Sequence, residues 1–257
     1  MSLPGAILFL VRVLPGELGI ALAQLSVLTY LLLRPDYRKE TLQNYWLVRG
    51  EKDSRFWLRN CLTVGRNLAL MARMGSARGD EIVDNAEVYI DNITLQTLER
   101  ELHSIMVSFH FGLWEFLPRV FTRAGYRVRV VTGRQKDKLL ERLIRRIRKD
   151  RQSPKVGPVR ITGFMLDNTC RGVQEWVELA GLKLRFPRAP FRLAARNNSK
   201  AIPLFAWLER GRLHVEVGRP GTEVDAARML LRLVRNHPEE WLFWAKASAL
   251  QPAEESE

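Results

Sequence analysis

The chain has 257 residues, of which 46% are hydrophobic and 27% are charged. This composition excludes an intrinsically disordered chain, and the length allows one sizeable α/β domain with an appendage rather than two full domains. The net charge of +13 predicts an anionic partner, and charge alone leaves open whether this is nucleic acid, a membrane surface or an acidic protein.

Cysteine and histidine usage bounds the chemistry further. The two cysteines form no CxxC pattern, and the four histidines are too scattered for a zinc motif. We therefore expect no metal and no dependence on disulfides.

The N-terminal region is the most apolar part of the chain. Residues 6–33 read AILFLVRVLPGELGIALAQLSVLTYLLL, but the uninterrupted part, 18–33, is shorter than the roughly 20 residues of a typical membrane-spanning helix. A membrane anchor or re-entrant helix, a helix buried in a soluble domain, and a cleaved signal are the three interpretations. If the segment is inserted, the basic stretch that starts at Arg34 places the downstream chain in the cytoplasm. We expect a hydrophobic membrane-associating segment over 1–45, a main domain over 46–250 and a disordered tail over 251–257.

The main domain shows strands separated by helical patterns. This alternation predicts an α/β fold with a mixed, mostly parallel sheet flanked by helices, and an antiparallel edge where Glu209-Arg210-Gly211 makes a hairpin. The helical patterns cover 36–74, 92–102, 113–123, 136–150 and 225–235, and extended segments cover 82–90, 105–109, 126–132, 160–166, 201–207 and 212–217.

The segment HFGLWE follows the apolar strand predicted at 105–109. His110 would stand at the strand tip, where a histidine can accept a proton near neutral pH. Glu115 could take the other ring N–H if the backbone turns between the two residues, and Gly112 supplies that freedom. The alternative is a strand-end histidine with a structural role only.

Polar residues also follow two other predicted strands. Arg134 comes after the strand at 126–132, and Asp167 and Asn168 follow the strand at 160–166. Parallel strands bring their carboxyl ends to one sheet edge, so we expect these residues near His110. Arg134 could bind a phosphate through paired N–H groups, and Asp167 and Asn168 could contact substrate. The alternatives are a solvated loop arginine and a simple turn cap.

Several collinear segments carry a resemblance to a known family. HFGLWE resembles the H-x4-[DE] block of glycerolipid-type acyltransferases, and it is most similar to the bacterial lipid A biosynthesis (lauroyl/myristoyl) family. The downstream segments VVTGR, LLERLIRRIR, FMLDN, FPRAP, LAAR, IPLF and HPEEWLFW follow in the order of that family. Leu113 stands where asparagine is usual, and the arginine after the terminal tryptophans is absent. A phosphate-binding Glu-Gly-Thr is also missing after Phe186-Pro187, which argues against a plain glycerol-phosphate acyltransferase.

The resemblance implies roles for individual residues. His110 and Glu115 would be catalytic, and backbone N–H groups of Gly112 and Leu113 would stabilise the oxyanion. The substrate-binding residues would be Arg134, Arg148, Asp167, Asn168, Phe186 and Arg188.

The resemblance also implies the reaction. An acyl chain would pass from acyl carrier protein or acyl-coenzyme A to a hydroxyl of an anionic membrane lipid or glycolipid, with a lipid A-type acceptor favoured. No metal or bound cofactor is needed, and the protein would lie at the bacterial inner membrane with its catalytic domain on the cytoplasmic side. The alternatives are a nucleic-acid-binding protein, suggested by charge alone and lacking a recognition motif, and a non-catalytic lipid-binding protein of the same fold.

Overall fold

The computed structural model describes residues 3–131, 141, 160–167, 173–244 and 250–253. The helices are α1 (Leu3–Val13), α2 (Gly16–Leu32), α3 (Pro35–Arg49), α4 (Phe56–Ala72), α5 (Ala77–Asp84), α6 (Asn92–Arg100), α7 (Leu117–Arg123), α9 (Ala189–Arg196) and α10 (Glu223–Asn236), with 3-10 turns η1 (Trp114–Phe116) and η2 (Pro238–Glu240). The strands are β1 (Glu87–Ile90), β2 (His103–Ser108), β3 (Arg127–Val130), β4 (Arg160–Met165), β5 (Gln174–Leu179), β6 (Leu182–Pro187), β7 (Ile202–Glu209), β8 (Arg212–Val217) and β9 (Leu250–Pro252).

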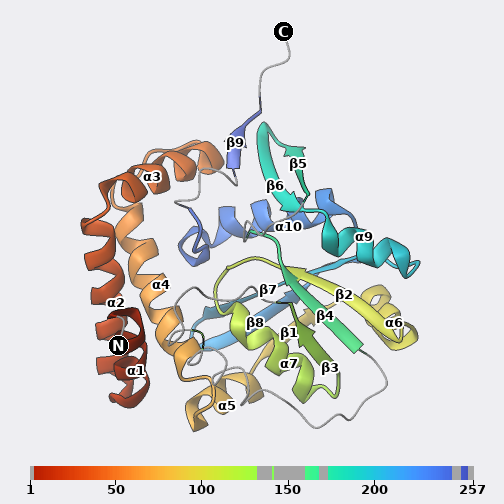
Figure 1. The fold of residues 1–257 in the computed structure, drawn as a ribbon, viewed down its shortest axis with the longest axis horizontal. Helices are drawn as coiled ribbons and strands as arrows, with labels where there is room; N and C mark the ends of the chain where they lie inside the picture. The colour runs from red at the N-terminus through yellow and green to blue at the C-terminus, as the bar shows by residue number, and fades with distance from the viewer. Residues whose placement is uncertain (1–2, 132–140, 142–159, 168–172, 245–249, 254–257) are drawn as a thin grey trace.

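A six-stranded sheet forms the centre of the fold (Figure 1). Its order is β1-β8-β7-β2-β4-β3, and all neighbours are parallel except the hairpin pair β7 and β8. This confirms the predicted α/β class with a mixed, mostly parallel sheet flanked by helices. A separate antiparallel sheet, β5-β6-β9, lies beyond α10.

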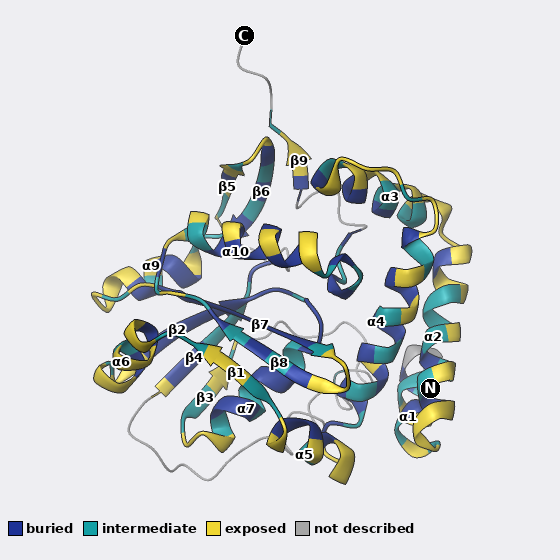
Figure 2. Ribbon diagram, turned by 180° about the vertical axis from the view of Figure 1, so that it is seen from behind, coloured by how far each residue is buried: buried dark blue, intermediate teal, exposed yellow. Residues whose placement is uncertain are grey.

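Alternate residues of β2 belong to two different cores, as the period of a strand requires. Ile105 and Val107, together with Phe109 just beyond the strand, join the core that includes α9, α10 and the small sheet. Met106 joins the core under α5, α6 and α7. Because both faces of β2 are covered, its carboxyl end is held rigidly inside the domain (Figure 2).

The N-terminal helices form an arm along one side of the sheet (Figure 1). Gly19 and Ala23 of α2 are buried, and Gly65 of α4 approaches α2 so closely that an added Cβ would lie 2.5 Å from the Cα of Gln24. Small residues at this contact allow the two backbones to approach each other. Among the described helices, none is long and apolar enough to cross a bilayer alone; α2 and α3 meet that composition only together, with a 96° bend between them.

Several boundaries differ from the sequence predictions. The extended segment expected at 82–90 begins as helix α5, because Ser76 caps that helix by accepting a hydrogen bond from the Gly79 N–H. The boundary expected at residue 45 falls inside α3. Gln251 and Pro252, expected in a disordered tail, belong to β9, which pairs with β6. The β5–β6 hairpin was not predicted, and the basic helix expected at 136–150 lies outside the described residues apart from residue 141.

Candidate active site

His110 and Asp167 meet at the carboxyl ends of two neighbouring parallel strands. Ser108 of β2 pairs with Met165 of β4, and each site residue lies two positions beyond its member of this pair. The Nδ1 atom of His110 lies 2.7 Å from Oδ1 of Asp167. The strand register therefore places an imidazole against a carboxylate at the sheet edge.

The side chain of Asp167 is 2% exposed, and both of its carboxylate oxygens have hydrogen-bond partners. Its Oδ2 accepts hydrogen bonds from the backbone N–H of His110 at 2.8 Å and from the indole N–H of Trp241 at 3.1 Å. A buried carboxylate is costly unless such donors surround it. The three contacts thus hold both carboxylate oxygens in one orientation.

The imidazole of His110 lies between two aromatic rings. Its centroid is 5.0 Å from that of Trp114 and 4.6 Å from that of Phe243, and the side chain is 15% exposed. A carboxylate on Nδ1 favours the tautomer with hydrogen on that atom, which leaves the lone pair on Nε2. The ring is thereby prepared to accept a proton at Nε2.

The carboxylate on Nδ1 differs from the one that we expected. The sequence suggested Glu115 as the partner of His110, but Asp167 occupies that position because the parallel register of β2 and β4 brings residues 110 and 167 together. Glu115 lies in η1, a short turn that begins after Leu113. The catalytic and orienting roles of Glu115 stay predictions, and Asp167 is the carboxylate that contacts Nδ1 of His110.

The expected oxyanion donors need correction as well. The N–H of Gly112 donates to the carbonyl of Glu240 at 2.8 Å, and the N–H of Leu113 donates to the carbonyl of Ala206 at 2.8 Å. Both groups are used in backbone pairing, and the Leu113 side chain is fully buried. These two N–H groups are thus not available to a developing negative charge.

The remaining predicted site residues divide into two groups. Phe186 is a buried core residue whose ring contacts that of Phe109 at 5.4 Å, and Arg188 forms a 2.8 Å ion pair with Glu175 at the surface. Arg134, Arg148 and Asn168 lie outside the described residues. Among the predicted site residues that the structure describes, His110, Asp167 and the turn at Gly112 lie together at the sheet edge.

Sequence reasoning missed the segment that backs the site. The segment HPEEWLFW predicted no site role for Trp241, yet the indole N–H of Trp241 contacts Asp167 directly. The signal that could have revealed this is chemical: a buried tryptophan N–H needs an acceptor, and Asp167 was already placed at the same sheet edge.

Helix α4 holds this segment from behind. The amide of Asn60 donates to the carbonyls of Glu239 and Trp241, each at 2.9 Å. The buried carboxylate of Glu240 accepts from Arg66 at 2.9 Å and from Asn67 at 2.6 Å. Burial raises the pKa of Glu240, although Arg66 and Asn67 act in the opposite direction.

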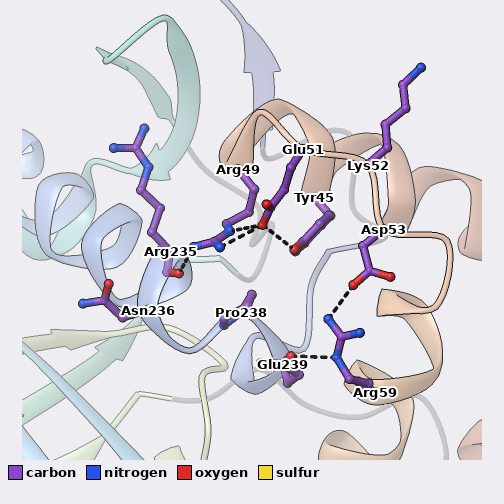
Figure 3. Close-up of a pocket in the computed structure, with 10 residues that line it drawn as sticks. All are labelled: Tyr45, Arg49, Glu51, Lys52, Asp53, Arg59, Arg235, Asn236, Pro238 and Glu239. Atoms are coloured by element: carbon purple, nitrogen blue, oxygen red, sulfur yellow. Dashed lines mark hydrogen bonds and ion pairs between the residues drawn. The ribbon is translucent and has the colours of Figure 1, made fainter.

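A separate cavity of about 500 Å³ lies where the end of α3, the start of α4 and the end of α10 meet (Figure 3). It is lined by Tyr45, Arg49, Glu51, Lys52, Asp53, Arg59, Arg235, Asn236, Pro238 and Glu239. Two of its lining arginines pair with acids: Arg49 pairs with Glu51, and Arg59 pairs with Asp53 and Glu239. Neither His110 nor Asp167 lines it, so this cavity is not the candidate site.

No protein-family model matches the sequence, and no curated protein matches it significantly.

Proposed function

We propose that this protein is an O-acyltransferase in which His110 is the general base. The observation that carries the proposal is the 2.7 Å contact between Nδ1 of His110 and the buried carboxylate of Asp167, at the end of a strand followed by the HFGLWE turn. An oriented imidazole with its lone pair on Nε2 is suited to activate a hydroxyl.

The reaction is a direct transfer. Nε2 of His110 takes the proton of the acceptor hydroxyl, and the oxygen attacks the carbonyl carbon of an acyl thioester. A C–O bond forms, the C–S bond breaks, and the thiolate leaves with the proton from the imidazolium. Asp167 stabilises the imidazolium between these two proton transfers, and no metal or cofactor is required.

The resemblance of HFGLWE and its collinear segments supports the substrate classes. The donor is acyl carrier protein or acyl-coenzyme A, and the acceptor is an anionic membrane lipid or glycolipid, with a lipid A-type acceptor favoured. The net charge of +13 and the apolar N-terminal arm support work at an anionic membrane, which we propose is the cytoplasmic side of a bacterial inner membrane.

Exposed leucines on α2 are the physical basis for membrane association. Leu18, Leu25 and Leu32 recur every seven residues on one helix face and are 58%, 60% and 54% exposed. Three large apolar side chains on one face suit the interface of a bilayer better than water.

The test is acyl transfer by purified protein. Labelled acyl carrier protein or acyl-coenzyme A is incubated with membrane lipid extract, and mass spectrometry detects acceptors that gain one acyl chain. His110→Ala should lower the rate by about 10²–10⁴-fold, since this is the usual contribution of a general base. Transfer at an undiminished rate in His110→Ala would overturn the proposal.

A parallel measurement addresses the alternatives. Salt-sensitive binding of DNA or RNA without acyl turnover would favour a nucleic-acid-binding protein. Lipid binding that is equal in wild type and His110→Ala, again without turnover, would favour a non-catalytic lipid-binding protein.

A further inference from the structure

The segment 240–242 runs antiparallel to the turn that carries His110. The Gly112 N–H donates to the Glu240 carbonyl at 2.8 Å, and the Leu242 N–H donates to the His110 carbonyl at 2.9 Å. Between these two bonds, Phe111 and Trp241 form an antiparallel bridge. The backbone of Trp241 is thus fixed directly to the turn of the candidate base.

The indole of Trp241 continues this connection through its side chain. It is 2% exposed, and its N–H donates to Oδ2 of Asp167 at 3.1 Å. The other oxygen of the same carboxylate contacts Nδ1 of His110. One buried carboxylate therefore joins the indole to the imidazole.

We propose that Trp241 is a positioning residue that holds the carboxylate of Asp167 in the orientation in which Asp167 engages Nδ1 of His110. The effect of Trp241 on turnover rests on the proposed function. The contacts that position Asp167 do not depend on it. Trp241 acts through Asp167 and is not itself a catalytic residue.

The physical argument concerns the charge on Asp167. With the indole N–H removed, Oδ2 keeps the backbone N–H of His110, and the carboxylate loses one of three donors. Its negative charge is then shared with fewer donors, so it stabilises the imidazolium of His110 more strongly. The pKa of His110 should therefore rise. The carboxylate is also freer to rotate, which misaligns the imidazole that it contacts, so turnover should fall.

Hydrogen bonds from α4 to the segment 240–242 make Trp241 suited to position Asp167. Asn60 donates to the Trp241 carbonyl, and Arg66 and Asn67 hold the neighbouring Glu240 side chain. The segment is therefore fixed by α4 on one side and by the His110 turn on the other. An indole held in this way can define the position of its acceptor.

The competing explanation is that Trp241 only fills space. Its ring contacts that of Trp244 at 5.1 Å, and Trp244 packs edge-on against Phe56 and Tyr45. Trp244 is a matched control, because it is equally buried in the same segment and its indole N–H donates to the Pro238 carbonyl instead, at 2.7 Å.

The experiment is an NMR titration of the His110 imidazole in isotopically labelled full-length protein. Wild type, Trp241→Phe and Trp244→Phe are compared. Among the described residues, the His110 ring contacts Asp167, Trp114 and Phe243. The acids of the flanking turns are Glu115, Glu239 and Glu240. Both variants retain all of these groups. We expect the pKa of His110 to rise by about half a unit or more in Trp241→Phe and to stay unchanged in Trp244→Phe.

Activity is the second measurement. We expect kcat of Trp241→Phe to fall about 3- to 10-fold with little change in KM, since only orientation of the base is lost. A His110 pKa in Trp241→Phe that equals the wild-type value overturns the inference, whatever the activity.

Two precautions keep the test decisive. If Trp241→Phe does not fold, 3-benzothienylalanine at position 241 keeps the ring shape and replaces the N–H with sulfur. A His110 pKa that equals the wild-type value in this variant again overturns the inference.

The titration needs no substrate, so it separates the two proposals. A shifted His110 pKa without any acyl transfer would refute the proposed function alone. An unshifted His110 with His110-dependent transfer would refute only the role of Trp241.

Discussion

At the scale of single residues, two carboxylates are candidates for the residue that orients the His110 imidazole. Glu115 shares the HFGLWE segment with His110, whereas Asp167 lies on another strand and contacts Nδ1 at 2.7 Å. Local spacing favours the first residue, and strand register favours the second. The contact with Nδ1 favours Asp167 as the residue that orients the proposed base.

Paired substitutions test this assignment. In Asp167→Asn, an amide that donates to Nδ1 would move the ring hydrogen to Nε2 and remove the lone pair needed for catalysis. We expect a loss of about 10²–10⁴-fold in kcat, measured by the acyl-transfer assay. Glu115→Gln should cost less than about tenfold. A larger loss in Glu115→Gln than in Asp167→Asn would return the orienting role to Glu115.

Gly112 is required by the shape of the turn. Its φ is +57°, and an added Cβ would lie 2.1 Å from the Ala206 carbonyl oxygen. Gly50 provides a matched control, because its φ is +72° and nothing lies within 4 Å of an added Cβ. Gly50→Ala should lower the free energy of unfolding by about 1 kcal/mol through backbone strain alone.

Gly112→Ala adds a steric clash to that strain. We expect the decrease in the free energy of unfolding of Gly112→Ala to exceed that of Gly50→Ala by about 2 kcal/mol, the usual scale of overpacking against fixed backbone. Urea unfolding of both variants measures the difference. Equal losses in the two variants would show that the turn can move away from Ala206.

At the scale of elements, α4 connects the N-terminal arm to the site. Its buried polar residues Asn60 and Asn67 do not contact His110, but they hold the segment that does. Buried polar side chains on a packed helix specify one arrangement, because any shift leaves them unsatisfied. The position of α4 and the position of Trp241 are therefore coupled.

The burial of Glu240 makes the contribution of its contact with α4 to stability depend on pH. Since the folded-state pKa of Glu240 is raised, the folded chain binds the proton more tightly than the unfolded chain does. This contribution to stability is fully present below the unfolded pKa of about 4.3 and is lost as pH rises through the folded pKa.

Glu240→Gln removes this titration. We expect the free energy of unfolding of wild type minus that of Glu240→Gln to decrease as pH rises from about 4.3, measured by urea unfolding at several pH values. A difference that increases with pH would mean that Arg66 outweighs burial and that the folded-state pKa is lowered.

At the scale of the whole molecule, the charge and the exposed leucines suggest one orientation at a membrane. Leu18, Leu25 and Leu32 are exposed residues of α2, which belongs to the arm beside the main sheet (Figure 1). An arm with this face in the bilayer would bring the domain close to the proposed lipid acceptor.

Vesicle binding tests this orientation. Changing Leu18, Leu25 and Leu32 together to Glu removes the exposed apolar surface that would enter the bilayer and adds repulsion from anionic lipid. We therefore expect affinity for anionic vesicles to fall at least about tenfold. Leu102→Glu is the control, because Leu102 is 73% exposed but lies next to β2 outside the arm. Equal binding by the triple variant and wild type in a flotation assay would contradict the proposed orientation.

The α/β class was determined by the sequence, because hydrophobic periodicity is a local pattern that can be recognised without knowing any tertiary contact. His110 at a strand tip and Asp167 at a neighbouring tip followed from the same patterns. Their direct pairing did not, since strand order and register are set by packing between segments more than 50 residues apart. Only the tertiary structure decided that Asp167 engages Nδ1, that Gly112 and Leu113 use their N–H groups in the backbone, and that Trp241 reaches the site. Each of these depends on contacts between distant segments, and no local pattern encodes them.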